Sequence, residues 1–475
     1  MNKEFHYYDW FSKLISGLIS IFLILSVFAV LYVFSSVFEG ITRYLVFFIV
    51  LSAYLLVVCF FKDKVLQIIK KIYISLKKID SKKLLLILCL MMIVLKIIYT
   101  VFFYFDATQD GDIKIYNDIA ESIVRTGSIS SSEISHLVGM GLHLAVFKYI
   151  GIPIHIGLFI AFFIGTIINY LSFKDIVGKE KTFMVIFVYL LMPSTMLFTF
   201  CPTHELFVYL YLSISIFALN RFMKTIKTSE KFLYAFLLIV FSVLTCFVNP
   251  AGYIIYIIIV LSVLLSNSDL LNKVVLIVVL VLSTLLSNLL TNQINPNQFN
   301  TTVNTYAILV QGSSMETMGE QMEEHPVRQV LFYLDDNNLP ITEESVISGI
   351  KNMLIEQYKY LITHPVELVK LLAHKFFRLW SGDYYAVELA YYYNAFNSIT
   401  YYIMLICGAL LYLFMITISV VFKKETSETY DISNYQLLIL GVFGVTILSV
   451  LLNKYRVYVT LFLYLVTIYR TEIEE

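Results

Sequence analysis

The chain has 475 residues, of which 59% are hydrophobic and 14% charged, and its 34 Lys and Arg balance 34 Asp and Glu. Soluble domains are about 45–50% apolar and about 25% charged, so this composition excludes a cytoplasmic enzyme, a disordered tail protein and a secreted disulfide scaffold. A formal net charge of zero gives no indication of a nucleic-acid partner.

Long apolar stretches recur along the whole chain. A bilayer-spanning helix needs about 17–25 apolar residues, and the sequence therefore predicts an all-α polytopic membrane protein with about twelve transmembrane helices. In chain order the expected spans are 14–38, 43–61, 84–105, 153–173, 182–199, 205–220, 232–248, 251–266, 274–290, 398–422, 435–452 and 457–469.

Lysine placement predicts the orientation of these spans. Short cytoplasmic loops collect Lys and Arg, and eight lysines lie in the expected loop between Lys62 and Lys83. With this loop in the cytoplasm, the other short Lys-rich loops fall on the same side and both termini are cytoplasmic. This scheme requires that the half-apolar stretch 134–150 lies at the interface and does not cross. It places the protein in the cell membrane as a multi-pass protein.

Two long segments, 106–152 and 291–397, then lie outside the cytoplasm, and long loops of this kind usually carry function. We expect 1–83 to be a two-span extension with a basic loop and 84–290 to be the transmembrane core. Residues 291–397 are expected to form a helical outer region that the polar tract 291–304 enters as a loop, and 398–475 the last spans.

The first outer segment carries three carboxylates, on Asp106, Asp110 and Asp112. Apolar spacing predicts a helix from Asp112 to a stop at Gly127. Asp112 fits an N-cap, and a carboxylate partly desolvated at a membrane boundary also fits a general base; the two roles are compatible. Asp110 and Asp112 form an Asp-x-Asp pair, a spacing that can offer oxygens to a divalent cation.

Two outer turns carry further polar groups. Glu205 begins an apolar helix just after His204, where an acid is favoured by the helix dipole; the alternative is a second acidic group facing the same cavity as Asp112. The stretch from Asn249 to Gly252 predicts a tight helix hairpin.

The second outer segment ends in a basic amphipathic helix. Lys370, His374 and Arg378 are spaced four apart and share one face, with Lys375 at its edge. The opposite, apolar face consists of Val369, Leu372, Phe376 and Leu379. The helix fits a membrane-surface helix, or one that presents cations to an anionic lipid headgroup. Arg456 lies in the outer turn between the last two expected spans.

These motifs together resemble those of the GT-C type membrane glycosyltransferases that use polyprenyl-phosphate sugars, such as the protein mannosyltransferases and the aminoarabinose transferases of lipid A. Asp112 matches the family's essential Asp, followed four residues later by an aromatic, here Tyr116. Further resembling stretches are Ala120 to Gly127, Pro193-Ser194, Glu205-Leu206-Phe207, Asn249-Pro250-Ala251-Gly252, His364 to Trp380 and Tyr455-Arg456. Asn249 stands where the family has Arg, and Ile113 where some members have a second acid.

The resemblance implies an inverting glycosyltransferase with an extracytoplasmic active site. Asp112, with Asp110 beside it, would be catalytic and act as the general base, with or without a divalent cation at Asp110, and no other cofactor is implied. Substrate contacts would come from Tyr116, His204, Glu205, Lys375, Arg378 and Arg456. The expected partners are membrane lipids, a polyprenyl-phosphate-linked sugar, and a glycan, lipid or protein acceptor.

Two alternatives stay open. An O-antigen-type polymerase or ligase also combines about a dozen spans with a large late outer loop, and would place its catalytic Arg and His in that loop. A transporter or flippase would carry polar groups in its span centres, where the sequence offers mainly Lys96, which we expect to snorkel outward.

Overall fold

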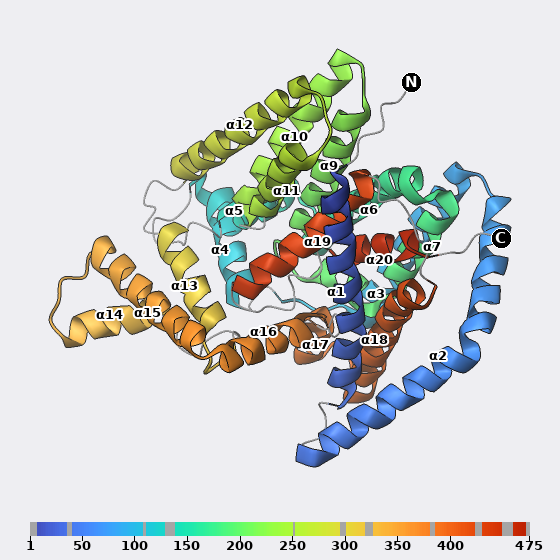
Figure 1. Ribbon diagram of the computed structural model, residues 1–475. Coiled ribbons are helices and arrows are strands. Elements are labelled where there is room, and N and C mark those ends of the chain that lie inside the picture. The colour runs from blue at the N-terminus through green and yellow to red at the C-terminus, as the bar shows by residue number, and fades with distance from the viewer. Residues whose placement is uncertain are drawn as a thin grey trace.

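The computed structural model describes residues 7–35, 40–107, 111–128, 138–249, 252–294, 301–318, 326–380, 385–422, 430–448 and 459–471. These ranges contain helices and no β-strand, which confirms the all-α fold. Figure 1 shows the helices gathered in one body, with α13, α14 and α15 projecting from one side and α2 running along the opposite side.

Eight helices are long and apolar enough to cross a membrane. They are α1 (Asp9–Ser35), α2 (Gly40–Lys77), α3 (Ser81–Phe103), α6 (Ile154–Val177), α9 (Glu205–Lys224), α10 (Thr228–Val248), α12 (Leu270–Ile294) and α18 (Ser398–Val421). A ninth candidate, either a broken crossing or a re-entrant segment, is bent: α7 (Lys179–Leu191) meets α8 (Pro193–Leu197) and the 3-10 turn η2 (Phe198–Phe200) at an angle of 72°. Pro193 explains the break, because proline cannot donate to the preceding helix turn.

The three other expected spans coincide with α11 (Gly252–Leu265), α19 (Tyr430–Leu448) and α20 (Thr460–Tyr469). Of these, α11 and α20 are short apolar helices in the part of the chain that the structure describes. The expectation of about twelve spans thus corresponds, within the described residues, to nine candidate helices or helix pairs and three further apolar helices that are not among those candidates.

The remaining helices connect the spans. They are α4 (Gly111–Thr126), α5 (Val138–Tyr149), α13 (Thr301–Ser313), α14 (Pro326–Asp336), α15 (Glu343–Thr363), α16 (Pro365–Trp380) and α17 (Tyr385–Tyr392). The expected interfacial helix within 134–150 is α5, whose 12 residues are too few to span a bilayer. The expected loop over 291–304 is shorter than predicted, because α12 runs to Ile294 and α13 begins at Thr301.

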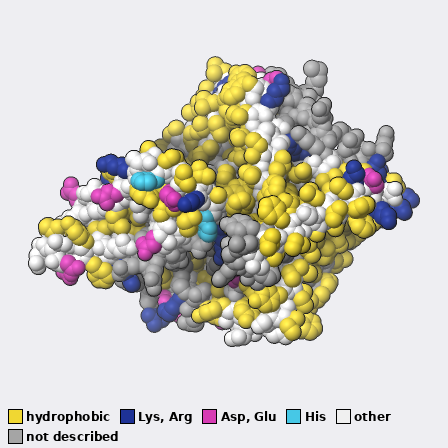
Figure 2. Space-filling model, turned by 60° about the horizontal axis from the view of Figure 1, so that its bottom comes forward, with side chains coloured by type: hydrophobic (Ala, Val, Ile, Leu, Met, Phe, Trp, Pro, Cys, Tyr) yellow, Lys and Arg dark blue, Asp and Glu magenta, His cyan; other side chains and the backbone are white. Residues whose placement is uncertain are grey.

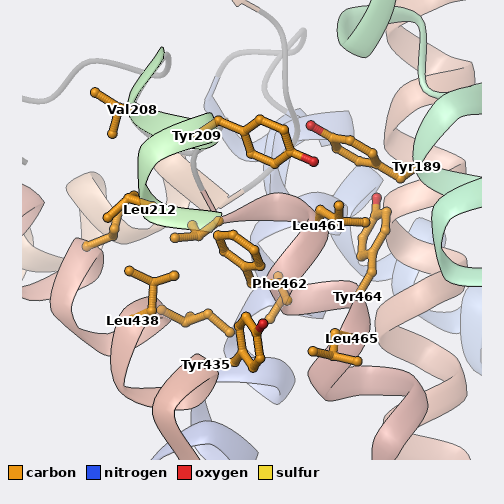
Figure 3. Close-up of a cluster of buried hydrophobic side chains, with 14 of the residues drawn as sticks. Tyr189, Val208, Tyr209, Leu212, Tyr435, Leu438, Leu461, Phe462, Tyr464 and Leu465 are labelled. Carbon is orange, nitrogen blue, oxygen red and sulfur yellow. The ribbon is translucent and has the colours of Figure 1, made fainter. Parts of the chain in front are cut away.

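The main core surrounds α9. This helix packs between α6 and α10, and aromatic rings fill its contacts: the Tyr209 ring centroid lies 6.2 Å from that of Phe462, which lies 5.3 Å from that of Tyr435. Figure 3 shows these rings converging from α9, α19 and α20. Segments distant in sequence therefore meet around one central helix, which fixes the position of Glu205 at its first turn.

A second, smaller core lies within α13, α14 and α15. It consists of Val310, Val330, Leu334, Val346, Ile350 and Leu354. Val346, Ile350 and Leu354 recur four residues apart on α15 and are buried, as the helical outer region expected over 291–397 requires. In Figure 2 apolar side chains cover most of the visible face of the main body, while several acidic side chains lie on the surface of the projecting left-hand part.

Candidate functional site

Four polar side chains from three separate segments meet near the start of α9. The Tyr116 hydroxyl on α4 lies 3.2 Å from Nδ1 of His204, and Nε2 of His204 lies 3.2 Å from the Glu205 carboxylate. The amide of Asn249, at the end of α10, contacts the same Nε2. An amide nitrogen only donates, so Nε2 of His204 accepts from Asn249, and Nδ1 carries the hydrogen that His204 donates to the Tyr116 hydroxyl.

The cluster is largely shielded from solvent. Tyr116 exposes 1% of its surface, His204 8% and Glu205 none. Buried polar groups are costly unless they are paired, so the mutual contacts of these side chains give the cluster a defined geometry. A carboxylate and an imidazole held in this way can orient hydroxyl groups or move a proton.

Local sequence positions each member. Ile113, Tyr116, Ile119 and Ala120 form the buried face of α4, which ends where Gly127 adopts a φ of +70° and its N–H bonds to Ile123. The predicted helix and its glycine stop are confirmed. At the hairpin, the N–H of Asn249 bonds to Thr245, and the N–H of Gly252 bonds back to Asn249 at 3.1 Å. The predicted helix hairpin is therefore confirmed as well.

Helix α5 sets the spacing between α4 and the spans. A Cβ on Gly139 would lie 2.2 Å from the carbonyl oxygen of Phe247 in α10, and one on Gly141 would lie 2.3 Å from the side chain of Ile119 in α4. Both glycines therefore allow close approach. Because Asn249 follows Phe247 by two residues, the fit of α5 determines how near Tyr116 comes to the other cluster members.

His143 fastens α5 to α9. Its Nδ1 lies 2.6 Å from the carbonyl oxygen of Gly139, and its Nε2 lies 2.5 Å from the hydroxyl of Tyr211. Since a carbonyl only accepts, Nδ1 carries the hydrogen and Nε2 accepts from Tyr211. Burial lowers the pKa of His143, which favours this neutral form. In the sequence, His143 was only one of three basic residues in a half-apolar stretch.

Lys96 braces the segment that leads to the cluster. Its Nζ donates to the hydroxyl of Thr199 at 2.7 Å and lies 3.6 Å from the ring centroid of Phe200. Only 4% of Lys96 is exposed, so the expectation that it snorkels outward is wrong. A hydroxyl and an aromatic face within the protein satisfy its ammonium group instead.

Asp112 lies in the first turn of α4, which begins at Gly111. The N-cap prediction is thus wrong by position: Asp112 falls inside the helix, where the dipole still favours an acid. The Asp112 side chain, all of Asp110 and all of Arg456 lie outside what the structure describes. Asp112 precedes Tyr116 by four residues on one helix, a spacing that places both on one face.

The face predicted for α16 needs correction. Lys375, predicted at the edge of the basic face, is 2% exposed, whereas Val369, predicted on the apolar face, is 65% exposed and Arg378 is exposed. The buried side consists of Leu371, Lys375, Phe376, Leu379 and Trp380. This helix packs against α1, α15 and α19, and Phe22 of α1 stacks edge-on to Trp380 at 4.5 Å. The side of α16 that carries Lys375 is therefore buried where this helix packs against its neighbours.

Among the described residues, no group of three or more His, Cys, Asp and Glu side chains is arranged to hold a metal ion. The Asp110 and Asp112 carboxylates, proposed for a divalent cation, lie outside that set. The five cysteines are free.

No family model matches the chain, and no curated protein matches its sequence. Among solved structures, the chain is similar to the archaeal oligosaccharyltransferase AglB from Archaeoglobus fulgidus, in complex with an inhibitory peptide and a dolichol-phosphate. The TM-score is 0.42 at 12% identity, and the similarity covers 83% of this chain and 50% of that one. The chain thus spans about half the length of AglB, and a likeness this distant determines neither activity nor substrate.

Proposed function

We propose that this protein is an inverting glycosyltransferase that moves a sugar from a polyprenyl-phosphate donor to an acceptor hydroxyl. One observation supports the proposal most: stretches that resemble GT-C motifs, separated in sequence, contribute Tyr116, His204, Glu205 and Asn249 to one buried polar cluster. A chance resemblance in unrelated loops would not be expected to converge in this way.

In the proposed reaction, Asp112 takes the proton of the acceptor hydroxyl as that oxygen attacks the anomeric carbon. The new bond joins the acceptor oxygen to the sugar, and the bond from the sugar to the phosphate oxygen breaks, so the lipid phosphate leaves as an anion. Tyr116, His204 and Glu205 hold sugar or acceptor hydroxyls. Arg378 and Arg456 balance the phosphate charge.

Helix lengths support an extracytoplasmic site. Helix α3 connects the lysines at the end of α2 to the segment that leads into α4. Its 23 residues extend about 35 Å, which exceeds the roughly 30 Å thickness of the hydrocarbon core. If the lysines face the cytoplasm, as the positive-inside rule favours, the cluster lies at the outer face of the cytoplasmic membrane.

The test is transfer of radiolabelled sugar from a panel of polyprenyl-phosphate sugars in proteoliposomes. We expect wild type to use one donor and Asp112→Asn to lose about 10²–10⁴-fold in rate, the usual contribution of a general base. Asp118→Asn is the matched control, because Asp118 lies on the same helix but is solvent-exposed and paired with Lys114 at 2.7 Å.

Full activity of Asp112→Asn would refute the proposed base and favour the polymerase or ligase alternative, in which His374 and Arg378 of the late segment would be changed next. If the wild-type protein uses no donor of the panel and lipid transport is detected in the same vesicles, the transporter alternative would replace the glycosyltransferase proposal.

A further inference from the structure

Helix α2 is longer than a membrane crossing requires. Its 38 residues extend about 57 Å, whereas the hydrocarbon core of a bilayer is about 30 Å thick. The expected loop after residue 61 is wrong, because the helix continues to Lys77. Its second half, 62–77, is therefore a helical extension beyond the span, and Figure 1 shows α2 lying along the outside of the body and changing direction along its length.

The helical extension has one side against the protein. Ile69, Tyr73 and Leu76 are buried, with 5, 9 and 7% of their surfaces exposed, and their spacing of four and three residues places them on one stripe. The extension is held at its end as well, because Nζ of Lys179 at the start of α7 donates to the backbone carbonyl of Ile79 at 2.8 Å.

Lys64, Lys71 and Lys78 lie away from this buried stripe, whereas Lys77 lies beside it, with its Nζ 5.1 Å from the ring centroid of Tyr73. Seven residues are close to two helical turns, so Lys64, Lys71 and Lys78 follow one line, and Lys70 and Lys77 follow a second line beside it. We call these five residues the lysine stripe. In Figure 2 dark blue side chains gather at the right-hand edge, the side on which α2 lies in Figure 1.

The protein does not neutralise the lysine stripe within its described residues. None of the ion pairs there involves a lysine of 62–83, a segment with eight lysines against Asp63 and Asp80. The chain as a whole has a formal net charge of zero, so this positive charge is a local concentration.

Exposed apolar side chains accompany the charge. Ile68, Ile72 and Ile74 of the same extension are 58, 47 and 56% exposed. A helix with lysines and exposed aliphatic residues beside a span matches segments that lie at the headgroup level, where the apolar groups insert and the cations meet phosphates.

We propose that the lysine stripe of α2 binds the headgroups of anionic phospholipids and holds α2 at the membrane surface. The occupant is bulk anionic lipid, because the charges are spread along about four helical turns rather than gathered in a pocket. This inference does not depend on the glycosyltransferase proposal.

The test measures the association of spin-labelled phosphatidylglycerol and spin-labelled phosphatidylcholine with the full chain in phosphatidylcholine vesicles, by electron paramagnetic resonance. Wild type is expected to prefer phosphatidylglycerol several-fold, since one lysine at an anionic surface contributes up to about fivefold. The preference should shrink in about 1 M NaCl, where the Debye length is about 3 Å.

Two matched variants separate charge from fold. In the first, the stripe is Lys64→Gln, Lys70→Gln, Lys71→Gln, Lys77→Gln and Lys78→Gln; in the second, the same five positions carry Arg. We expect the Gln variant to lose most of the preference and the Arg variant to keep it. Equal association of both lipids with wild type, or a full preference in a folded Gln variant, would overturn the proposal. If the Gln variant does not fold, a salt-insensitive preference in wild type would overturn it.

Discussion

Lys375 has an energetic cost that depends on pH. Burial lowers its pKa to about 8, below the roughly 10.4 of an unfolded chain. Between these values the unfolded chain binds more protons, so stability rises with pH across that window. Below about pH 8 the charged, buried lysine costs roughly 3 kcal/mol.

We therefore expect Lys375→Met to raise the melting temperature in detergent at pH 7 and to have little effect near pH 10.5. The control is Lys370→Met, since Lys370 is 58% exposed and pairs only with Glu367; such surface pairs are worth about 0–1 kcal/mol. An equal gain at both pH values would mean that packing, not charge burial, sets the effect.

The hydroxyl of Tyr116 gives a second residue-scale prediction. Tyr116→Phe keeps the ring and removes the hydrogen bond to His204, and leaving a buried partner unsatisfied costs about 1–3 kcal/mol. We expect sugar transfer to fall roughly tenfold. Tyr149→Phe, on an 81% exposed tyrosine of α5, should match wild type; a similar loss there would point to a general effect of Tyr→Phe.

Residue by residue, the sequence predicted the polar members of the cluster but not their contacts. His204 and Glu205 are neighbours in the chain, and the stretch from Asn249 to Gly252 predicted a turn. Their contacts with Tyr116, however, depend on how α4, α9 and α10 pack. Lys96 and Lys375 were misjudged for one reason: local patterns cannot show whether a neighbouring helix covers a lysine.

At the scale of helices, the glycine contacts of α5 predict a sharp steric effect. Gly139→Ala would place a methyl group against the backbone of Phe247, and that backbone cannot rotate away as a side chain could. We expect α5 to shift and sugar transfer to fall at least tenfold, with a loss of about 1–3 kcal/mol from overpacking.

The matched control is Gly17→Ala in α1, where a Cβ meets no atom within 4 Å. It should keep wild-type transfer and, because alanine favours helices, equal or higher stability. Wild-type transfer by Gly139→Ala would show that the spacing set by α5 is not needed at the site.

Helix positions were largely predictable from apolar runs and from turn residues such as Pro193 and Gly127. Helix ends and faces were less so. The lysines after residue 61 suggested a loop, but Lys is a good helix former, so α2 continues. The inward face of α16 is decided by Phe22 on α1, a residue more than 350 positions earlier, which spacing within α16 cannot reveal.

At the scale of the whole molecule, two separate cores predict two separable responses. Ile350 is fully buried in the small core of α13, α14 and α15, and Ile→Ala in a core costs about 2–5 kcal/mol. We expect Ile350→Ala to open 301–363 to a protease while the membrane body stays intact.

Cleavage sites mapped by mass spectrometry would check this, with Ile362→Ala, at a 75% exposed position, as control. Loss of the entire body in Ile350→Ala would show that the two cores unfold as one unit.

The earliest and latest parts of the chain depend on each other. The hydroxyl of Tyr7 donates to the amide oxygen of Asn434 at 2.7 Å, across 427 positions, and α1 packs on α16, α18 and α19. At synthesis rates of about 5–20 residues per second, α1 waits roughly 20–90 s for these neighbours. During biogenesis α1 therefore persists in the bilayer with α2, which it also contacts, before its late neighbours exist, so the N-terminal pair must remain stable without the contacts that complete the fold.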